Sequence, residues 1–163
     1  MIGETRTKPM EILLVEDSLM DARVTIFSLR RSGIHHRLTL VRTVDEAVQF
    51  LNRRGVFALV PEMDLVLLDL MLPDGNGTDV LAEMRKAEGD KAMVTTVVLS
   101  ACDDASERSK CDELGVQDYI QKPVSEAEFL RVVREHKQHM IDNQRPPSRI
   151  VPVPHHQLLA SSH

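Results

Sequence analysis

The sequence has 163 residues, of which 42% are hydrophobic and 28% charged, and its formal net charge is -5. This length and composition suit one globular domain with one core and leave little room for a second domain. No segment approaches the roughly 20 apolar residues of a membrane span, and the N-terminal segment lacks the apolar core of a signal peptide, so we expect a cytoplasmic protein without membrane contact. The negative charge, without a long basic run, argues against a nucleic-acid surface.

The two cysteines, Cys102 and Cys111, have no neighbours in a metal-ligand spacing. They are also too few for a disulfide framework. We therefore expect two reduced, structural thiols.

An acid pair follows the first predicted strand. Residues 10–15, MEILLV, predict a first buried strand, and Glu16 and Asp17 come directly after it. Ser18 and Asp21 then have the spacing of a helix N-terminal cap, and the apolar residues that follow share one helical face. We expect a strand, an acid pair and a helix in succession.

Two more elements precede the central strand. A short strand is expected near residues 37–42, and Thr43 with Glu46 forms the capping box of a second helix that ends near Gly55. The apolar segment 56–63, VFALVPEM, then delays the next strand. This segment either packs over the sheet edge or contacts a partner, and we expect packing.

The chain is organised around residues 65–77, LVLLDLMLPDGNG. The apolar run predicts a strand buried on both faces of a parallel sheet, ending at Asp69, and Pro73, Gly75 and Gly77 then break the chain. In open α/β sheets, ligands bind at the carboxyl ends of the strands, so Asp69 is placed for chemistry. The alternative is an acid that merely starts a turn.

The next three elements follow in the same alternation. Thr78 is expected to cap a third helix, and residues 95–100, TTVVLS, predict a fourth strand that ends at Ser100. Asp104 suits the start of a fourth helix, which closes at Gly115.

A lysine ends the last predicted strand. Residues 117–122 alternate like an edge strand, Lys122 is its final residue, and Pro123 follows directly. Ser125 and Glu128 form the capping box of a fifth helix.

The fifth helix carries His136 on its apolar face, so we expect a packing residue rather than a ligand. From Gln144 onward the chain is rich in proline and cannot continue the helix. We expect an extended or disordered tail.

Five alternations of strand and helix predict an α/β fold with a doubly wound, five-stranded parallel sheet and five helices. Alternation alone does not fix the strand order. A flavodoxin-like order 2-1-3-4-5 would bring several polar residues to one crevice at the carboxyl ends of the strands. These residues are Glu16, Asp17, Asp69, Ser100 and Lys122.

This set of side chains suits phosphoryl transfer. Carboxylates that share one pocket repel one another unless a cation intervenes, and oxygen ligands favour Mg²⁺. A carboxylate can attack phosphorus and form an aspartyl-phosphate. Positive charge on the phosphoryl oxygens would then come from Mg²⁺ and Lys122, while Ser100 offers a hydroxyl to another oxygen.

The ordered set resembles the receiver domain of bacterial response regulators over roughly residues 9–141, which leaves 142–163 as a proline-rich C-terminal tail. No single piece is specific, but the order of the pieces is. The matching positions are the pair Glu16 and Asp17, then Asp69, Pro73, Gly77, Ser100, Tyr119 and the pair Lys122 and Pro123.

The resemblance implies a two-component phosphorelay in which Asp69 accepts a phosphoryl group from a sensor histidine kinase. It implies that Mg²⁺ is bound by Asp17, Asp69 and the backbone carbonyl of Met71, with Glu16 acting through water. The protein would be a signalling receiver that promotes only its own phosphorylation and dephosphorylation.

The resemblance also assigns roles on the other side of Asp69. Lys122 would pair with the phosphate, and its bond to Pro123 would be cis. Ser100 would be drawn toward the phosphate and vacate space into which Tyr119 turns, changing the surface that other proteins bind.

Segments 15–25 and 118–129 and the delayed third strand are similar to the single-domain regulators that partner bacterial and cyanobacterial phytochromes. Such regulators are often dimers. We therefore expect a homodimer that uses the fourth helix, the fifth strand and the fifth helix.

Three other functions fit the sequence less well. A flavodoxin-type cofactor-binding protein is the first, but the loop EDS after the first strand would repel the cofactor's phosphate. A phosphatase of the haloacid dehalogenase type is the second, but Met71 stands where that family has a second Asp. The third is a receiver that serves only as a binding scaffold; it would lack an acid or the lysine, and none is missing here.

Only 22 residues follow position 141 (163 minus 141), so we expect no output domain there. The chain would signal by changing its surface, or would pass phosphate to a histidine phosphotransfer protein.

Overall fold

The computed structural model describes residues 8–88, 94–101 and 104–144. Cys102 and the segment 145–163, on which two of the sequence predictions fall, lie outside these residues. The elements are β1 (Met10–Val15), α1 (Leu19–Arg31), β2 (His36–Val41), α2 (Val44–Leu51), the 3-10 helix η1 (Gly55–Phe57), β3 (Leu65–Asp69), β4 (Met71–Leu72), β5 (Gly75–Asn76), α3 (Gly77–Glu88), β6 (Thr95–Ser100), α4 (Ala105–Glu113), β7 (Asp118–Gln121) and α5 (Glu126–Gln144).

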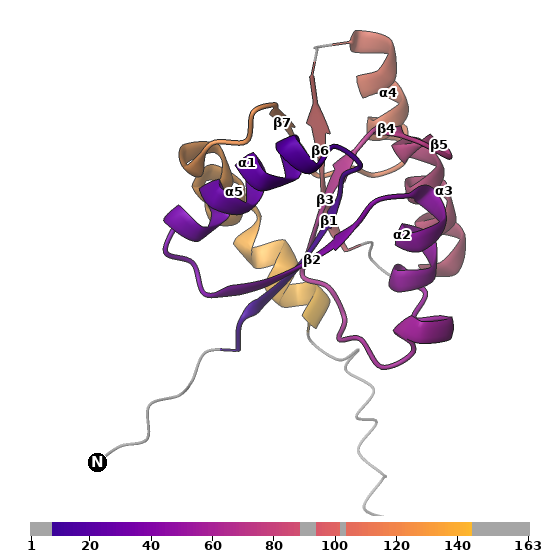
Figure 1. The fold of residues 1–163 in the computed structure, drawn as a ribbon, viewed down its shortest axis with the longest axis horizontal. Coiled ribbons are helices and arrows are strands. Elements are labelled where there is room, and N and C mark those ends of the chain that lie inside the picture. Colours follow the sequence, from indigo (N-terminus) through magenta and orange to yellow (C-terminus); the bar gives the residue numbers. More distant parts are fainter. Residues whose placement is uncertain (1–7, 89–93, 102–103, 145–163) are drawn as a thin grey trace, which may run out of the picture.

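The main sheet has five strands in the order β2-β1-β3-β6-β7, and every neighbouring pair is parallel. Counted along the chain as strands one to five of this sheet, the order is 2-1-3-4-5, as predicted. Helices α1 and α5 cover one face, and α2, α3 and α4 lie on the other (Figure 1). Parallel neighbours need such helical crossovers, so the sheet is wound on both sides.

Each face of the sheet has its own core. Leu13 and Val15 of β1 belong to one cluster of buried apolar residues, whereas Ile12 and Leu14 belong to the other. Successive residues of a strand point to opposite faces, so a strand covered on both sides needs apolar residues without interruption. This is why residues 12–15 of β1 and 65–68 of β3 are unbroken apolar runs in the sequence.

Three predicted helix caps are confirmed. The hydroxyls of Ser18, Thr43 and Ser125 accept hydrogen bonds from backbone N–H groups three residues later, at 3.2, 3.0 and 3.1 Å. The predicted cap at Thr78 is wrong: its own N–H donates to the Asn76 side chain at 2.9 Å. Helix α3 begins at Gly77, one residue before the predicted cap.

Gly77 fixes the start of α3 against the end of β3. Its N–H donates to the Leu70 carbonyl at 2.8 Å, and a Cβ built on it would lie 2.5 Å from the Asp69 carbonyl oxygen. No side chain fits at that distance, so the residue must be glycine.

The sequence did not predict the hairpin of β4 and β5, which projects from the loop after Asp69. At its turn, the Asp74 carboxylate accepts hydrogen bonds from the N–H groups of Val44 and Asp45, at 2.7 and 3.1 Å. These bonds lower the pKa of Asp74. The hairpin thus caps the N-terminus of α2 from outside the helix.

Part of the segment 56–63 packs against the core, as expected, and part of it is exposed. Phe57, Val60 and Met63 pack against the core, whereas Val56 and Leu59 are 89% and 95% exposed. Packing is confirmed for only part of the segment.

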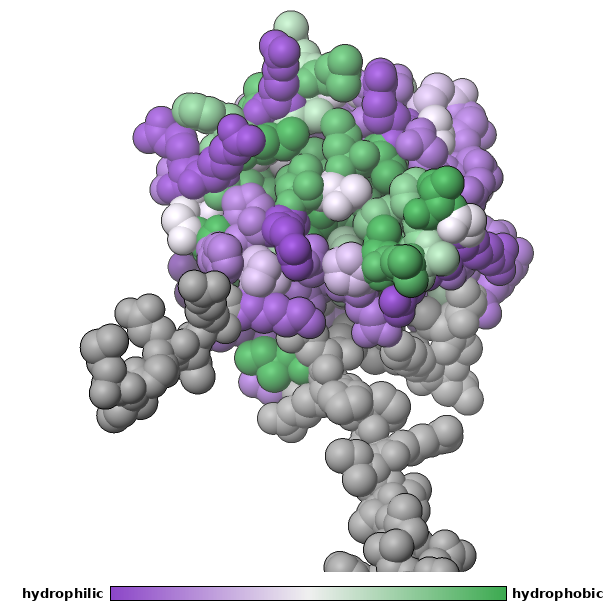
Figure 2. Space-filling model, turned by 60° about the horizontal axis from the view of Figure 1, so that its bottom comes forward, coloured by the Kyte–Doolittle hydropathy of each residue, from purple (hydrophilic) through white to green (hydrophobic). Residues whose placement is uncertain are grey.

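Further large apolar side chains are exposed on α1, namely Leu19, Met20, Val24 and Phe27. The face turned forward in Figure 2 is hydrophobic across its centre and mostly hydrophilic around it. None of the helices within the described residues is long and apolar enough to cross a membrane.

Candidate functional site

The predicted site residues meet at the carboxyl ends of the central strands. Glu16 directly follows β1, Asp69 ends β3, Ser100 ends β6 and Lys122 follows β7. Because β1, β3, β6 and β7 are consecutive parallel strands, all four residues lie at one edge of the sheet.

Lys122 holds the acids of this edge together. Its Nζ lies 2.6 Å from Glu16 Oε1, 3.0 Å from Asp69 Oδ2 and 3.1 Å from Asp21 Oδ2. The Glu16 side chain is fully buried, and those of Asp69 and Lys122 are only 11% and 14% exposed. One ammonium therefore compensates three carboxylates in a largely desolvated pocket.

The pocket makes its two buried acids different. Burial and a hydrogen bond with Asp69 raise the pKa of Glu16 to about 7. Burial also opposes ionisation of Asp69, but hydrogen bonds from Glu16, the Met71 N–H and Lys122 prevail and lower the pKa of Asp69. Of the two acids, Glu16 is therefore the one that holds a proton more readily, and Asp69 the one that ionises more readily.

The structure does not bring Asp17 into this cluster. Its side chain is 45% exposed and pairs with Arg42 at 3.3 Å, and Arg42 also donates to the Asp17 backbone carbonyl at 3.0 Å. To reach the pocket, the carboxylate has to leave this partner.

Asp21 is the site residue that sequence reasoning missed. Its backbone N–H donates to the Ser18 side chain, as predicted, but its carboxylate reaches Lys122, 101 residues further along the chain. The signal lay in its position: the first turn of α1 starts directly after β1, so an acid there lies close to the strand end.

The pocket fits a hydrated divalent cation. Glu16 Oε1 is buried and, apart from its ion pair with Lys122, accepts no well-directed hydrogen bond within the described residues. A buried carboxylate oxygen in this condition is costly unless a cation or water satisfies it. Asp69 adds a second hard oxygen ligand, and Mg²⁺ accepts one or two carboxylates together with several waters.

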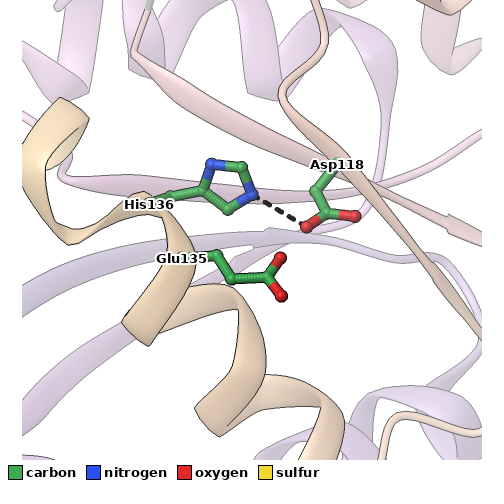
Figure 3. Close-up of side chains that lie close together, drawn as sticks. All are labelled: Asp118, Glu135 and His136. Atoms are coloured by element: carbon green, nitrogen blue, oxygen red, sulfur yellow. Dashed lines mark hydrogen bonds and ion pairs between the residues drawn. The ribbon is translucent and has the colours of Figure 1, made fainter.

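A second acidic cluster lies on β7 and α5. Potential ligand atoms of Asp118, Glu135 and His136 lie within 4.8 Å of one another, and the His136 ring is hydrogen-bonded to Asp118 at 2.8 Å (Figure 3). Both carboxylates, however, already accept from the guanidinium of Arg131, at 2.7 and 2.9 Å. The cluster is therefore an ion-pair network, and His136 is part of it rather than a simple packing residue.

Tyr119 and Ser100 border a pocket of about 150 Å³ on the other side of Asp69. The Tyr119 hydroxyl points outward, donating to the Arg108 carbonyl and the Asp112 carboxylate at 2.9 and 2.6 Å, and the Arg108 guanidinium stacks 4.4 Å from the ring centre. The space between strand end and tyrosine is therefore open.

The other predicted residues lie as follows. The Met71 N–H donates to Asp69 Oδ1 at 3.1 Å, and the exposed Met71 side chain stands at the rim of the site. The Lys122–Pro123 peptide bond is cis, as expected. Cys111 is a buried free thiol, and burial raises its pKa to about 11.

Comparison with known proteins agrees with this geometry. The profile of the response regulator receiver domain matches residues 12–134. The response regulator Rcp1 of Synechocystis is 35% identical over 133 residues, which are 82% of this chain and 90% of Rcp1.

Two solved structures are also similar. The phosphorylated cyanobacterial phytochrome response regulator RcpA is 30% identical with a TM-score of 0.67, covering 86% of this chain and all of that one. The Mn²⁺-bound form of Rcp1 is 33% identical with a TM-score of 0.67, covering 81% and 95% of the two chains. From its fold, its site and these matches, the chain belongs to the response regulator receiver family.

Proposed function

We propose that this chain is a two-component response regulator in which Asp69 accepts a phosphoryl group from a sensor histidine kinase. The observation that carries the proposal is the contact of the ionised Asp69 carboxylate with the Lys122 ammonium at 3.0 Å, in a pocket of surplus negative charge. Structural ion pairs on a surface do not need such a pocket.

The transfer follows from these groups. An Asp69 oxygen attacks phosphorus and forms the new P–O bond, while the P–N bond to the donor histidine breaks and its electron pair stays on the imidazole. Lys122 is already within hydrogen-bond distance of Asp69 and can follow the charge onto a phosphoryl oxygen. Asp69, the Met71 carbonyl and Asp17, once released from Arg42, would hold Mg²⁺, with Glu16 acting through water. The ion would supply further positive charge to the phosphoryl group.

The kinase has to contact the surface around Asp69, because the phosphoryl group passes directly between the two proteins. Helix α1 begins beside the pocket and exposes Leu19 and Met20, which line an apolar groove with Leu40 of β2. An apolar helix face next to the acceptor suits the docking of a partner helix. Because relatives are named as phytochrome response regulators, we propose a phytochrome-type kinase as the donor.

The deciding experiment is Mg²⁺-dependent labelling by acetyl phosphate, followed by intact mass. The wild type should gain one phosphoryl group, and Asp69→Asn none. Asp45→Asn is the matched control, because the Asp45 carboxylate is exposed and its hydrogen-bond partner among the described residues is Gln49 of its own helix. Labelling that survives in Asp69→Asn would contradict the proposal. Profiling against the histidine kinases of the host would then identify the donor.

We propose that phosphorylation is transmitted through Ser100 and Tyr119. An aspartyl-phosphate adds strong acceptors that draw the Ser100 hydroxyl toward Asp69, and the pocket between the two residues offers Tyr119 an inward position. The outward hydrogen bonds to Arg108 and Asp112 hold the resting state. A few kcal/mol of differential binding suffices to shift such a population.

NMR of Tyr119, the only tyrosine, tests this switch. A beryllofluoride mimic of the phosphate should shift its ring signals in the wild type and much less in Ser100→Ala. An identical response in both proteins would remove Ser100 from the mechanism.

The surface that changes includes α4, β7 and α5, which we propose as the homodimer interface. Ile141, on the last turns of α5, is 40% exposed and available for such a contact. Light scattering at high micromolar concentration, with and without beryllofluoride, should show a dimer in at least one state. A monomer in both states would reject it, and would favour a role as a phosphate carrier to a histidine phosphotransfer protein.

A further inference from the structure

Asp21 is the third carboxylate on Lys122, and it belongs neither to the acid pair after β1 nor to the phosphoryl acceptor. We infer that Asp21 is a positioning residue that holds the Lys122 ammonium on the open side of the pocket and so directs its remaining protons toward Glu16 and Asp69. This inference rests on the proposed acceptance of a phosphoryl group by Asp69.

The Lys122 ammonium has a limited number of N–H donors. An ammonium has three protons, and Lys122 faces three carboxylates at 2.6, 3.0 and 3.1 Å. Within the described residues, Nζ donates hydrogen bonds to Asp69 and Asp21, and it meets Glu16 Oε1 as an ion-pair contact at 2.6 Å. Asp21 therefore takes one of the two hydrogen bonds that the ammonium donates.

The three acids that face Lys122 differ in what they contact when the site is loaded. Glu16 and Asp69 are the groups that a metal ion and a phosphoryl group engage, so both of their bonds to Lys122 change when the site is loaded. Asp21 is 46% exposed and extends from α1 on the solvent side. It is the one partner whose contact with Lys122 can persist, and it keeps the long lysine side chain from sampling other rotamers.

The alternative is that Asp21 only stabilises its own helix, since acids in the first turn of a helix interact favourably with the helix dipole. A first-turn acid of α2, Asp45, shows what that role looks like: its carboxylate accepts from Gln49, one turn along the same helix, at 2.7 Å. Asp21 instead reaches a lysine on another element. A small pocket lined by Asp21, Lys122 and Pro123 marks where the two elements meet.

The kinetic test is a double-mutant cycle on labelling by acetyl phosphate at saturating Mg²⁺. Asp21→Ala should slow labelling about fivefold, the effect of one partly exposed ionic hydrogen bond, and Asp21→Glu should restore most of the rate. In the Lys122→Ala background, Asp21→Ala should have no further effect, because Asp21 acts through that lysine.

Asp45→Ala is the control for loss of a first-turn acid, and its rate should match the wild type. A rate in Asp21→Ala equal to the wild type, or an equal loss in both backgrounds, would overturn the inference. A wild type that is not labelled at all would reject the proposed function instead.

A second measurement does not need phosphorylation. The ammonium ¹H–¹⁵N NMR signal of a lysine is seen only when hydrogen bonds slow proton exchange. The signal that Lys122→Ala removes should also vanish in Asp21→Ala and remain in Asp45→Ala. Its persistence in Asp21→Ala would show that Asp21 does not hold the lysine, whatever the labelling result.

Discussion

Two places in the molecule each gather three carboxylates around one cation. At the carboxyl ends of the strands, Lys122 faces Glu16, Asp21 and Asp69; on β7 and α5, Arg131 faces Asp118, Glu128 and Glu135. The charge ratio is the same in both clusters.

They differ in donors, burial and origin. Arg131 has five N–H donors in a planar fork, and it bonds both oxygens of Asp118. Its partners Glu128 and Glu135 are half exposed and lie within one turn of it on the same helix. Lys122 has three donors for acids from three elements, one of them fully buried.

The difference shows that charge balance alone does not make a stable cluster. The Arg131 network is satisfied as it stands and suits a structural role. The Lys122 pocket leaves a buried oxygen poorly satisfied and a carboxylate protonated near neutral pH. An unsatisfied acidic pocket of this kind suits the cation and the phosphoryl group of the proposed function.

Exchanging the two cations for alanine should separate the clusters most clearly. Lys122→Ala should lower the rate of labelling by acetyl phosphate about 100-fold, because it removes positive charge aimed at the transferring group. Arg131→Ala should change that rate less than about twofold. Labelling should be followed by intact mass, and equal losses in the two variants would erase the functional distinction.

The proton on Glu16 should appear as a pH dependence of stability without metal. The folded-state pKa of about 7 exceeds the ordinary value of 4.5, so this contribution to stability is complete below about pH 4.5 and is lost as the pH rises through about 7. Thermal unfolding with chelator should show a melting temperature that falls from pH 5 to pH 8. Glu16→Gln should flatten this slope, and Mg²⁺ should stabilise the wild type more at pH 8 than at pH 5.

The Arg131 network should respond with the opposite sign. Burial opposes ionisation of Asp118, but the bonds from Arg131 and His136 lower its pKa, so its contribution is present above the ordinary value of 3.8 and lost as the pH falls below it. Arg131→Ala should cost about 1 kcal/mol in urea unfolding at pH 7 and less at pH 3. A cost independent of pH would mean that packing, and not charge, is lost.

The smallest expected effect concerns Asp17, whose carboxylate lies outside the pocket. If Asp17 is a metal ligand, as proposed, Arg42 has to release it, so Arg42→Ala should tighten Mg²⁺ binding about twofold to fivefold, the range of one exposed ion pair. Asp17→Ala should weaken binding by more than this, whereas Glu16→Gln should do less, since its contact is through water. Titration calorimetry measures all three, and weaker binding in Arg42→Ala would show that Arg42 helps to place Asp17.

The sequence predicted the five strands of the main sheet and the helix caps at Ser18, Thr43 and Ser125 because these depend on local patterns of two and 3.6 residues. The sheet order does not follow from such patterns, and it was predicted because it brings the polar strand ends together. The sequence also brought Glu16, Asp69 and Lys122 together, since strand ends meet at one edge. It did not predict where flexible side chains point. Asp17 turns to Arg42, Asp21 turns to Lys122, and Arg131 gathers its network through contacts that no local pattern records.

The hydrogen bonds between Asp74 and the N-terminus of α2 hold one side of the site more firmly than the side that faces Tyr119. The loop that leaves Asp69 is anchored at one point by Asp74 and at another by the close approach of Gly77 to the β3 backbone. Strain arising at Asp69 cannot relax easily through either anchor. The pocket beside Tyr119 offers the opposite condition, with open volume and a side chain held by surface hydrogen bonds. We therefore expect the displacement that the proposed switch requires to run toward β6, β7 and α4.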